Sequence, residues 1–319
     1  MKEAFAECAV VASNQLGEGI LWCASLQCLY WTDIESATLW RHHPATGVTD
    51  TWPMPERLAC LALCESDDWL LLGLASRLVF FHLPTRRIET VCEVEPHLPT
   101  RINDGACDRE GRFVFGTKHE PRNGEPPERV GSFYRLDPDL SLHRLDLDNI
   151  AIANGIAFSP NGRIMYFCDS PTRVIHRCEY DATGCTKSVH RWVDLRGGAG
   201  EPDGAAMDAD GGLWVALWGA GRVVRFDPKG SKDLTVHVPT RLPSRPTLGG
   251  DGLDTLYVTS ARDGLTASEL RDDPQAGHVF SAAFATQGLP EPRFSGSLPA
   301  SPLVHSRHEH NRHLSRGTT

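Results

Sequence analysis

The stretch "NDGACDREGRFVFGT", residues 103–117, contains a short apolar run, a turn and a second apolar run. Two later stretches repeat this order: "NGIAFSPNGRIMYFCDS" from residue 154 and "DGAAMDADGGLWVALW" from residue 203. In each copy the turn glycine (Gly111, Gly162 or Gly211) comes eight positions after the first polar residue. β-Branched and aromatic runs joined by Gly, Asn and Asp are typical of β-hairpins. Their fixed phase predicts an internal repeat.

The same phase extends to three other parts of the chain. "GEGILWCASLQCLYWTD" (17–33) has Leu26 eight positions after Glu18, while "ACLALCESDDWLLLGL" (59–74) and "TLGGDGLDTLYVTSA" (247–261) are weaker copies. Further hairpin signals follow the units, such as "TLWRHHPATG" and "RVVRFDPKG". Six units of roughly 40 to 50 residues with about four strands each predict an all-β six-bladed β-propeller. A pair of β-sandwich domains would not be expected to share one phase across six units.

The predicted propeller occupies residues 1–297 as a single domain. Residues 298–319, including "VHSRHEHNRHLSRGTT", are expected to form a disordered tail containing His and Arg. Four histidines in that tail are candidates only for adventitious metal binding.

Composition is that of a soluble globular protein: 319 residues, 40% hydrophobic and 23% charged. A net charge of -9 argues against nucleic acid or an anionic membrane as the main partner. No apolar run approaches the roughly 18 residues of a membrane span. The N-terminal residues make a poor secretory signal, so we expect a cytoplasmic protein.

Ten cysteines are scattered along the chain without a CxxC pair. Several lie in apolar strand-like runs, as in "RIMYFCDS". We therefore expect reduced, buried thiols and no zinc–thiolate cluster.

Equivalent positions of a propeller's blades converge at one end of its central channel. The residues expected to begin the innermost strands are, in order, Glu18, Ala59 or Cys60, Asn103, Asn154, Asp203 and Thr247. Four of these carry carboxylates or carboxamides, with a glycine one or two positions later. Each alone would be an ordinary turn residue. Two carboxylates facing a narrow pore repel each other unless they are neutralised, and oxygen ligands suit a hard divalent cation. The pattern predicts a metal site in the channel, with Glu18 as one wall.

Several motifs resemble the senescence marker protein/regucalcin and gluconolactonase family. They are "LGEGILW", "RINDGACDREGRFVFGT", "IANGIAFSPNG", "EPDGAAMDADGGLWVALWGAGRVVRFDP" and "LYVTSARDGL", in order from about residue 7 to about residue 295. The resemblance implies a six-bladed propeller that hydrolyses sugar lactones with one divalent metal. It implies Glu18, Asn154 and Asp203 as metal ligands and Asp203 as the proton-transfer residue. Arg101 and Asn103 would contact the substrate.

The sequence departs from the animal relatives after "GT", where they have Met and then an acidic pair. Here the stretch is "KHEPR", in which only Glu120 is acidic and Lys118 adds a cation. We expect Lys118 to begin a loop at the channel mouth, so Lys118 and Glu120 join the candidate substrate-binding residues. A solvated loop residue is an equally good interpretation of Lys118.

The absence of one catalytic motif also bears on the expected mechanism. No GxSxG elbow is present, so a metal would polarise the lactone carbonyl and acidify the attacking water. Asp203 would accept the proton and return it to the leaving ring oxygen. Two alternatives stay open: a non-enzymatic calcium-binding or scaffold propeller, and a related metal-dependent esterase or phosphotriesterase. The lactone, the metal (Ca, Mg, Mn or Zn) and the oligomeric state are not determined by the sequence.

Overall fold

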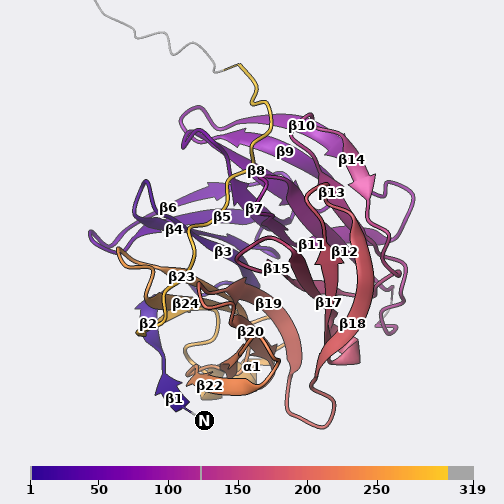
Figure 1. The fold of residues 1–319 in the computed structure, drawn as a ribbon. Coiled ribbons are helices and arrows are strands. Elements are labelled where there is room, and N and C mark those ends of the chain that lie inside the picture. Colours follow the sequence, from indigo (N-terminus) through magenta and orange to yellow (C-terminus); the bar gives the residue numbers. More distant parts are fainter. Residues whose placement is uncertain (1, 123, 301–319) are drawn as a thin grey trace, which may run out of the picture.

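Six β-sheets make up the structure, a computed structural model that describes residues 2–122 and 124–300 (Figure 1). Each sheet is built mainly from consecutive strands joined as hairpins. Blade 1 contains β3 (Gly17–Cys23), β4 (Cys28–Asp33), β5 (Thr38–His43) and β6 (Val48–Pro53). Blade 2 contains β7 (Leu58–Leu63), β8 (Trp69–Leu74), β9 (Arg77–His82) and β10 (Arg87–Glu93). Blade 3 contains β11 (Thr100–Cys107), β12 (Phe113–His119), β13 (Phe133–Leu136) and β14 (Leu142–Arg144).

The other three blades follow the same plan. Blade 4 contains β15 (Ala153–Phe158), β16 (Ile164–Asp169), β17 (Val174–Tyr180) and β18 (Thr186–Asp194), with a 3-10 helix at Ser170–Thr172. Blade 5 contains β19 (Glu201–Met207), β20 (Leu213–Trp218), β21 (Arg222–Phe226) and β22 (Lys232–His237). Blade 6 contains β23 (Pro243–Gly249), β24 (Thr255–Ser260) and β25 (Val279–Ala283), with helix α1 (Ala267–Asp272) before its last strand.

The innermost strands form a closed ring. β3 contacts β7, and the contacts continue through β11, β15, β19 and β23 back to β3. Figure 1 shows the sheets arranged radially around these strands. The predicted six-bladed propeller is therefore confirmed, and two separate sandwiches are excluded.

The N-terminal segment closes the ring. β2 (Glu7–Val10) pairs antiparallel with β25 and supplies the outer strand of blade 6. β1 (Lys2–Phe5) lies parallel to β22 and extends blade 5. Because the first strands complete the last blades, the ring has no open end between blade 6 and blade 1.

Apolar side chains fill the space between neighbouring blades. Six buried clusters are found among the described residues, and each joins two adjacent blades. In one, Tyr30 of blade 1 packs with Phe81 of blade 2, and in another Tyr166 of blade 4 packs with Phe226 of blade 5. Burying a side chain of this size contributes roughly 1.5–3 kcal/mol, so blade packing stabilises the fold.

Local sequence accounts for the hairpins. Gly111, Gly162 and Gly211 have positive φ angles of 78°, 68° and 79°, a conformation that glycine adopts at little cost. They lie in the turns between the first two strands of blades 3, 4 and 5. The three turn positions read from the repeat are confirmed.

Every innermost strand also contains a register shift near its start. The shifts lie between Glu18 and Leu21, Leu58 and Cys60, Ile102 and Gly105, Asn154 and Ala157, Pro202 and Ala205, and Pro243 and Pro246. Bulges change the direction in which side chains point and are frequent beside functional sites. In blade 6 the shifted residues are Ser244 and Arg245, so the sequence alignment on Thr247 is wrong by two to three positions. The reason is that blade 6 lacks the carboxylate or carboxamide followed by glycine that marks this position in blades 1, 3, 4 and 5.

The C-terminal segment crosses the other end of the propeller. Gln287 O accepts a hydrogen bond from Ala209 N, Phe294 N donates to Leu63 O and Ser295 N donates to Gly111 O. These partners lie at the hairpin ends of the innermost strands, opposite the bulges. Residues of the predicted tail beyond 300 lie outside the described residues.

All ten cysteines lie in the described part of the chain, and none of them forms a disulfide there. Seven are buried as predicted, but Cys8 and Cys185 are exposed and Cys92 is half-buried. Cys8 is on the added outer strand of blade 6, and Cys185 is in the turn between the two outer strands of blade 4. No helix within residues 2–122 and 124–300 is long and apolar enough to cross a membrane.

Candidate functional site

A cavity of about 190 Å³ lies at the bulge end of the channel. Its lining includes Glu18, Arg101, Asn103, Lys118, Asn154 and Asp203, together with Leu16, Ile34, Ile152, Ser170, Glu201, Pro202, Trp218 and Asp263. Six of the seven candidate residues from the sequence thus meet in one place, although they are spread over 186 positions (18 to 203). Glu120 does not line this cavity.

Two buried carboxylates share the cavity. Glu18 is 8% exposed and Asp203 is 9% exposed. Burial raises the pKa of Glu18 to about 7, and the nearby negative charge of Asp104 adds to the shift while Arg245 opposes it. Burial raises the pKa of Asp203 well above its usual range, and the Glu18 and Asp104 carboxylates raise it further. Asp203 makes no hydrogen bond or ion pair with any described residue, so its negative charge lacks a direct partner in the protein.

A third acid, Asp104, lies near these two carboxylates without lining the cavity. Its Oδ1 accepts from Gly105 N at 2.7 Å and from the Arg245 guanidinium, and its Oδ2 accepts from Ile156 N at 2.9 Å. Arg245 also donates to Gly105 O. The ion pair therefore connects blade 3 with blades 4 and 6 beneath the candidate site.

The two asparagines are hydrogen-bonded to each other. Asn103 Nδ2 donates to Asn154 Oδ1 at 3.0 Å and to Ala153 O at 2.9 Å. Asn154 Nδ2 donates to Ser170 Oγ at 2.9 Å, and that hydroxyl donates to Pro202 O at 2.7 Å. Each Oδ1 oxygen keeps a second lone pair. Asn103 therefore retains an acceptor site but has no donor left for a ligand.

Arg101 joins the pair from the other side. Its Nη1 donates to Asn103 Oδ1 and to Ile102 O, both at 2.8 Å. Its Nε lies 3.5 Å from Glu120 Oε1, while Glu120 Oε2 accepts from Arg57 Nη2 at 2.5 Å. Glu120 is thus an ion-pair partner of Arg101 outside the cavity. Arg101 Nη2 has no partner among the described residues.

Lys118 lies in a strand and not at the start of a loop. It is the next-to-last residue of β12, opposite Arg101 in the register, and it also forms a bridge with Ile152 of blade 4. The strand continues because blades 3 and 4 both hydrogen-bond to it, which the local sequence does not reveal. Burial, together with the Arg101 charge, lowers the pKa of Lys118 to about 8. Its ammonium has no hydrogen bond or ion pair within the described residues.

The donor set at the cavity suits a divalent cation. Within residues 2–122 and 124–300 no group of three or more His, Cys, Asp or Glu side chains is placed to hold a metal. The ligands expected from the sequence are the carboxylates of Glu18 and Asp203 and the carboxamide of Asn154, so only two of them belong to these residue types. Buried carboxylates with raised pKa values, one of them without any partner, are stabilised by a nearby positive charge, and oxygen ligands match hard cations. Glu18, Asp203 and the Asn154 oxygen therefore fit such an ion.

Sequence reasoning missed three of the polar residues that organise the site. Asp104 is next to Asn103 in the repeat and had a usable signal, because the pair "ND" puts two polar residues before Gly105. Arg245 and Ser170 lie outside the positions compared in the repeat alignment. Thr247, which the alignment chose, lines a different cavity of about 60 Å³ on the side of residues 289–292.

The fold and the cavity define a six-bladed β-propeller with one polar, partly acidic site at a mouth of its channel. The chain belongs to the family described as "SMP-30/Gluconolactonase/LRE-like region", whose sequence model matches residues 16–262. The resemblance seen in the motifs is therefore confirmed.

Relatives with assigned names cover most of the chain. An L-arabinolactonase of Azospirillum brasilense is 51% identical over 284 residues, covering 89% of this chain and 93% of the relative. A 6-deoxy-6-sulfogluconolactonase of Pseudomonas putida is 35% identical, covering 91% of this chain and 98% of the relative. Among solved structures, the calcium-binding protein regucalcin from Agrobacterium tumefaciens superposes with a TM-score of 0.86 at 29% identity, covering 92% of this chain and 99% of that one.

Proposed function

We propose that this protein is a lactonase that hydrolyses a sugar lactone to the sugar acid with the help of one divalent cation. The observation that carries the proposal is the buried, unpartnered carboxylate of Asp203 beside Glu18 in the channel cavity. The 51% identity to an L-arabinolactonase supports the class of substrate. The name of the Agrobacterium structure supports a divalent cation.

Glu18, Asn154 and Asp203 would hold the cation through their side-chain oxygens. When bound there, a divalent cation polarises a carbonyl and lowers the pKa of a water molecule. Calcium and magnesium do so less than zinc, so a protein base assists. Three protein ligands leave room for a ligand from solution.

Asp203 is the proposed proton carrier. It accepts a proton from the water that attacks the lactone carbonyl and returns it to the ring oxygen as the ring C–O bond breaks. Its position at the cavity, with no side-chain hydrogen bond to residues 2–122 or 124–300, suits this role. Correct positioning of this group matters because general acid–base catalysis contributes roughly 10²- to 10⁴-fold.

The remaining polar groups favour a hydroxylated substrate over an apolar ester. Arg101 has Nη2 free to donate to a hydroxyl or to the developing carboxylate. Lys118 adds a cation on the same wall, and Asn103 offers one acceptor lone pair. Ile34, Ile152 and Trp218 also line the cavity and give apolar surface for the C–H face of a sugar ring.

The test is acid release from a panel of aldono-1,4- and aldono-1,5-lactones, with L-arabinolactone first. The full-length protein is stripped with EDTA and reconstituted with Ca²⁺, Mg²⁺, Mn²⁺ or Zn²⁺. We expect turnover that disappears on stripping and returns with at least one cation. Turnover that persists in EDTA would remove the cation from the proposal. Tight cation binding without turnover of any lactone would favour the calcium-binding alternative.

A further inference from the structure

A continuous hydrogen-bonded chain runs through the candidate site. It leads from the Arg101 guanidinium through the amides of Asn103 and Asn154 to the Ser170 hydroxyl and ends at Pro202 O. Every link is between 2.7 and 3.0 Å long. Pro202 is the residue immediately before Asp203, so the chain spans three blades and ends beside the proposed proton carrier.

The two ends of the chain determine the direction of every bond in it. A guanidinium can only donate, and a backbone carbonyl can only accept. Arg101 therefore requires an oxygen on the near side of Asn103, which places the Asn103 nitrogen toward Asn154. Ala153 O, a second acceptor, requires the same orientation of Asn103. Asn154 must then present its oxygen to Asn103 and its nitrogen to Ser170.

This orientation matters because only the oxygen of a carboxamide can coordinate a cation. The Asn154 oxygen keeps a lone pair after accepting from Asn103, whereas its nitrogen carries two hydrogens and repels a cation. A 180° rotation of the amide would put two NH₂ groups face to face at the Asn103 link. At the other link Ser170 supplies the acceptor for the Asn154 nitrogen. Asn154 and Ser170 are each 5% exposed, so water is a poor substitute.

We propose that Ser170 is a positioning residue: by accepting from Asn154 and donating to Pro202 O, it keeps the Asn154 oxygen oriented for a divalent cation. The inference rests on the proposed function, since it concerns the same cation. Ser170 itself is not a proposed ligand. Without its hydroxyl the Asn154 NH₂ group is buried without this acceptor, so only the bond from Asn103 still holds the plane of the amide and the oxygen is free to tilt away from the cation.

The experiment compares three variants of the full-length protein with the wild type. Ser170→Ala removes the hydroxyl, and Ser170→Thr keeps it. Thr172→Val is the matched control, because Thr172 lies in the same 3-10 helix and its hydroxyl donates to Asp169 O at 2.7 Å, outside the chain. The dissociation constants of Ca²⁺ and Mn²⁺ are measured by titration calorimetry on chelator-stripped protein, and thermal unfolding is followed without added cation.

Loss of an outer partner of a metal ligand typically weakens metal binding by about 10- to 100-fold. We expect that loss in Ser170→Ala, while Ser170→Thr and Thr172→Val bind within about two-fold of wild type. The unfolding temperature should fall in both Ser170→Ala and Thr172→Val, and further in Ser170→Ala, because it loses two hydrogen bonds and Thr172→Val loses one.

Two results would overturn the inference alone: cation binding in Ser170→Ala equal to that of Thr172→Val, or a loss in Ser170→Thr as large as in Ser170→Ala. A wild-type protein that binds no divalent cation would overturn both the metal-dependent function and this inference. The two failures are therefore distinguishable.

Discussion

Two aspartates five residues apart, one inside β19 and one just after it, have opposite surroundings. Asp208, at the hairpin end, is 0% exposed and accepts from Arg225 Nε at 2.6 Å, from Trp214 Nε1 at 2.8 Å and from the backbone N–H groups of Asp210 and Gly212. Asp203, at the bulge end, is nearly as buried and has no partner among the described residues. A buried carboxylate without partners is costly to ionise, whereas a paired one supports the fold.

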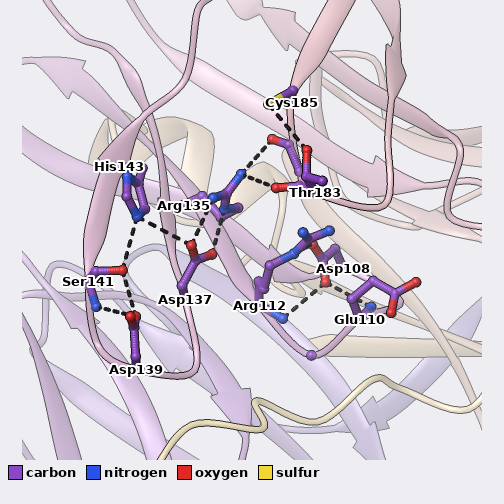
Figure 2. A network of polar contacts seen from close by, with 12 residues as sticks. Asp108, Glu110, Arg112, Arg135, Asp137, Asp139, Ser141, His143, Thr183 and Cys185 are labelled. Carbon is purple, nitrogen blue, oxygen red and sulfur yellow. Dashed lines mark hydrogen bonds and ion pairs between the residues drawn. The ribbon is translucent and has the colours of Figure 1, made fainter.

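The hairpin end of blade 3 repeats the first pattern. Asp108 accepts from Arg112 Nε at 2.5 Å and from the backbone N–H of Glu110 at 2.9 Å, and the neighbouring Arg135 pairs with Asp137. Figure 2 shows these residues pointing toward one another in a connected polar network. Asp108 and Asp208 at the hairpin end are thus paired within the protein, whereas Asp203 at the bulge end has no partner among the described residues. The comparison separates residues that stabilise the fold from those available for chemistry.

Asp203→Asn should have the largest effect on rate. The amide keeps an oxygen but cannot accept the proton, so we expect kcat to fall by roughly 10²- to 10⁴-fold while a cation stays bound. The unfolding temperature should not fall, because the charge that is removed has no partner in the part of the chain that the structure describes. Kinetics, calorimetry and thermal unfolding of one preparation test all three points. Near-normal turnover with a cation bound would exclude Asp203 as the proton carrier.

Asp208→Ala should reduce the stability of the fold and leave substrate binding unchanged. Removing one member of a buried ion pair costs about 3–5 kcal/mol. In this variant Arg225 keeps only the half-exposed Asp233 as an ion-pair partner, and Trp214 Nε1 loses its acceptor. We expect that loss in the free energy of unfolding, measured with urea, and an unchanged KM for the fraction that stays folded. Little loss of stability would mean that the hairpin-end charges are less important than their pairing indicates.

Lys118→Met tests whether the free cation of the bulge end selects the substrate. One charge-assisted hydrogen bond is worth about 1.5–3 kcal/mol, or roughly 10- to 150-fold in kcat/KM. We expect that loss for lactones with an anionic or hydroxyl-rich distal group and a smaller loss for the others. Lys187→Met is the control, since Lys187 is an exposed residue of β18, the outermost strand of blade 4. An equal loss for all lactones would place Lys118 outside the part of the site that determines specificity.

A further effect is the pH dependence of that selectivity. Because burial lowers the pKa of Lys118 to about 8, its charge is present below that pH and is lost as the pH rises through it. The preference for an anionic lactone over a neutral one should therefore decline between about pH 7 and pH 9 and be flat in Lys118→Met. For folding the sign is opposite: between pH 8 and the unfolded value of 10.5 the unfolded chain binds more protons, so stability relative to Lys118→Met rises with pH.

Arg57→Met tests whether a residue outside the cavity positions Arg101 at the bulge end. Arg57 holds Glu120, which in turn contacts Arg101, so its removal should loosen Arg101 without removing any group that lines the cavity. A KM increase of a few-fold with unchanged unfolding is expected, since partly exposed ion pairs contribute only about 0.2–1 kcal/mol. A change in kcat with KM constant would contradict this positioning role for Glu120.

The sequence by itself determined the architecture and four of the inner positions. Gly111, Gly162 and Gly211 mark turns whose conformation depends on local backbone sterics, and short apolar runs define strands that are buried on both faces. Because each blade repeats one local pattern, a common phase was enough to bring Glu18, Asn103, Asn154 and Asp203 to one cavity. Their roles as ligands and proton carrier stay predictions that the variants above test.

Only the tertiary structure decided which of these groups are free. Arg245 pairs with Asp104 across 141 residues of sequence, and Glu120 is engaged by Arg57 and Arg101 and does not line the cavity. Lys118 lies in a strand because two blades hydrogen-bond to it, and Ser170 meets Asn154 because a 3-10 helix follows β16. Local spacing sets backbone conformation, but partners for charges and amides come from other blades. Which residues become partners depends on how the six innermost strands, each with its bulge, are arranged around the ring.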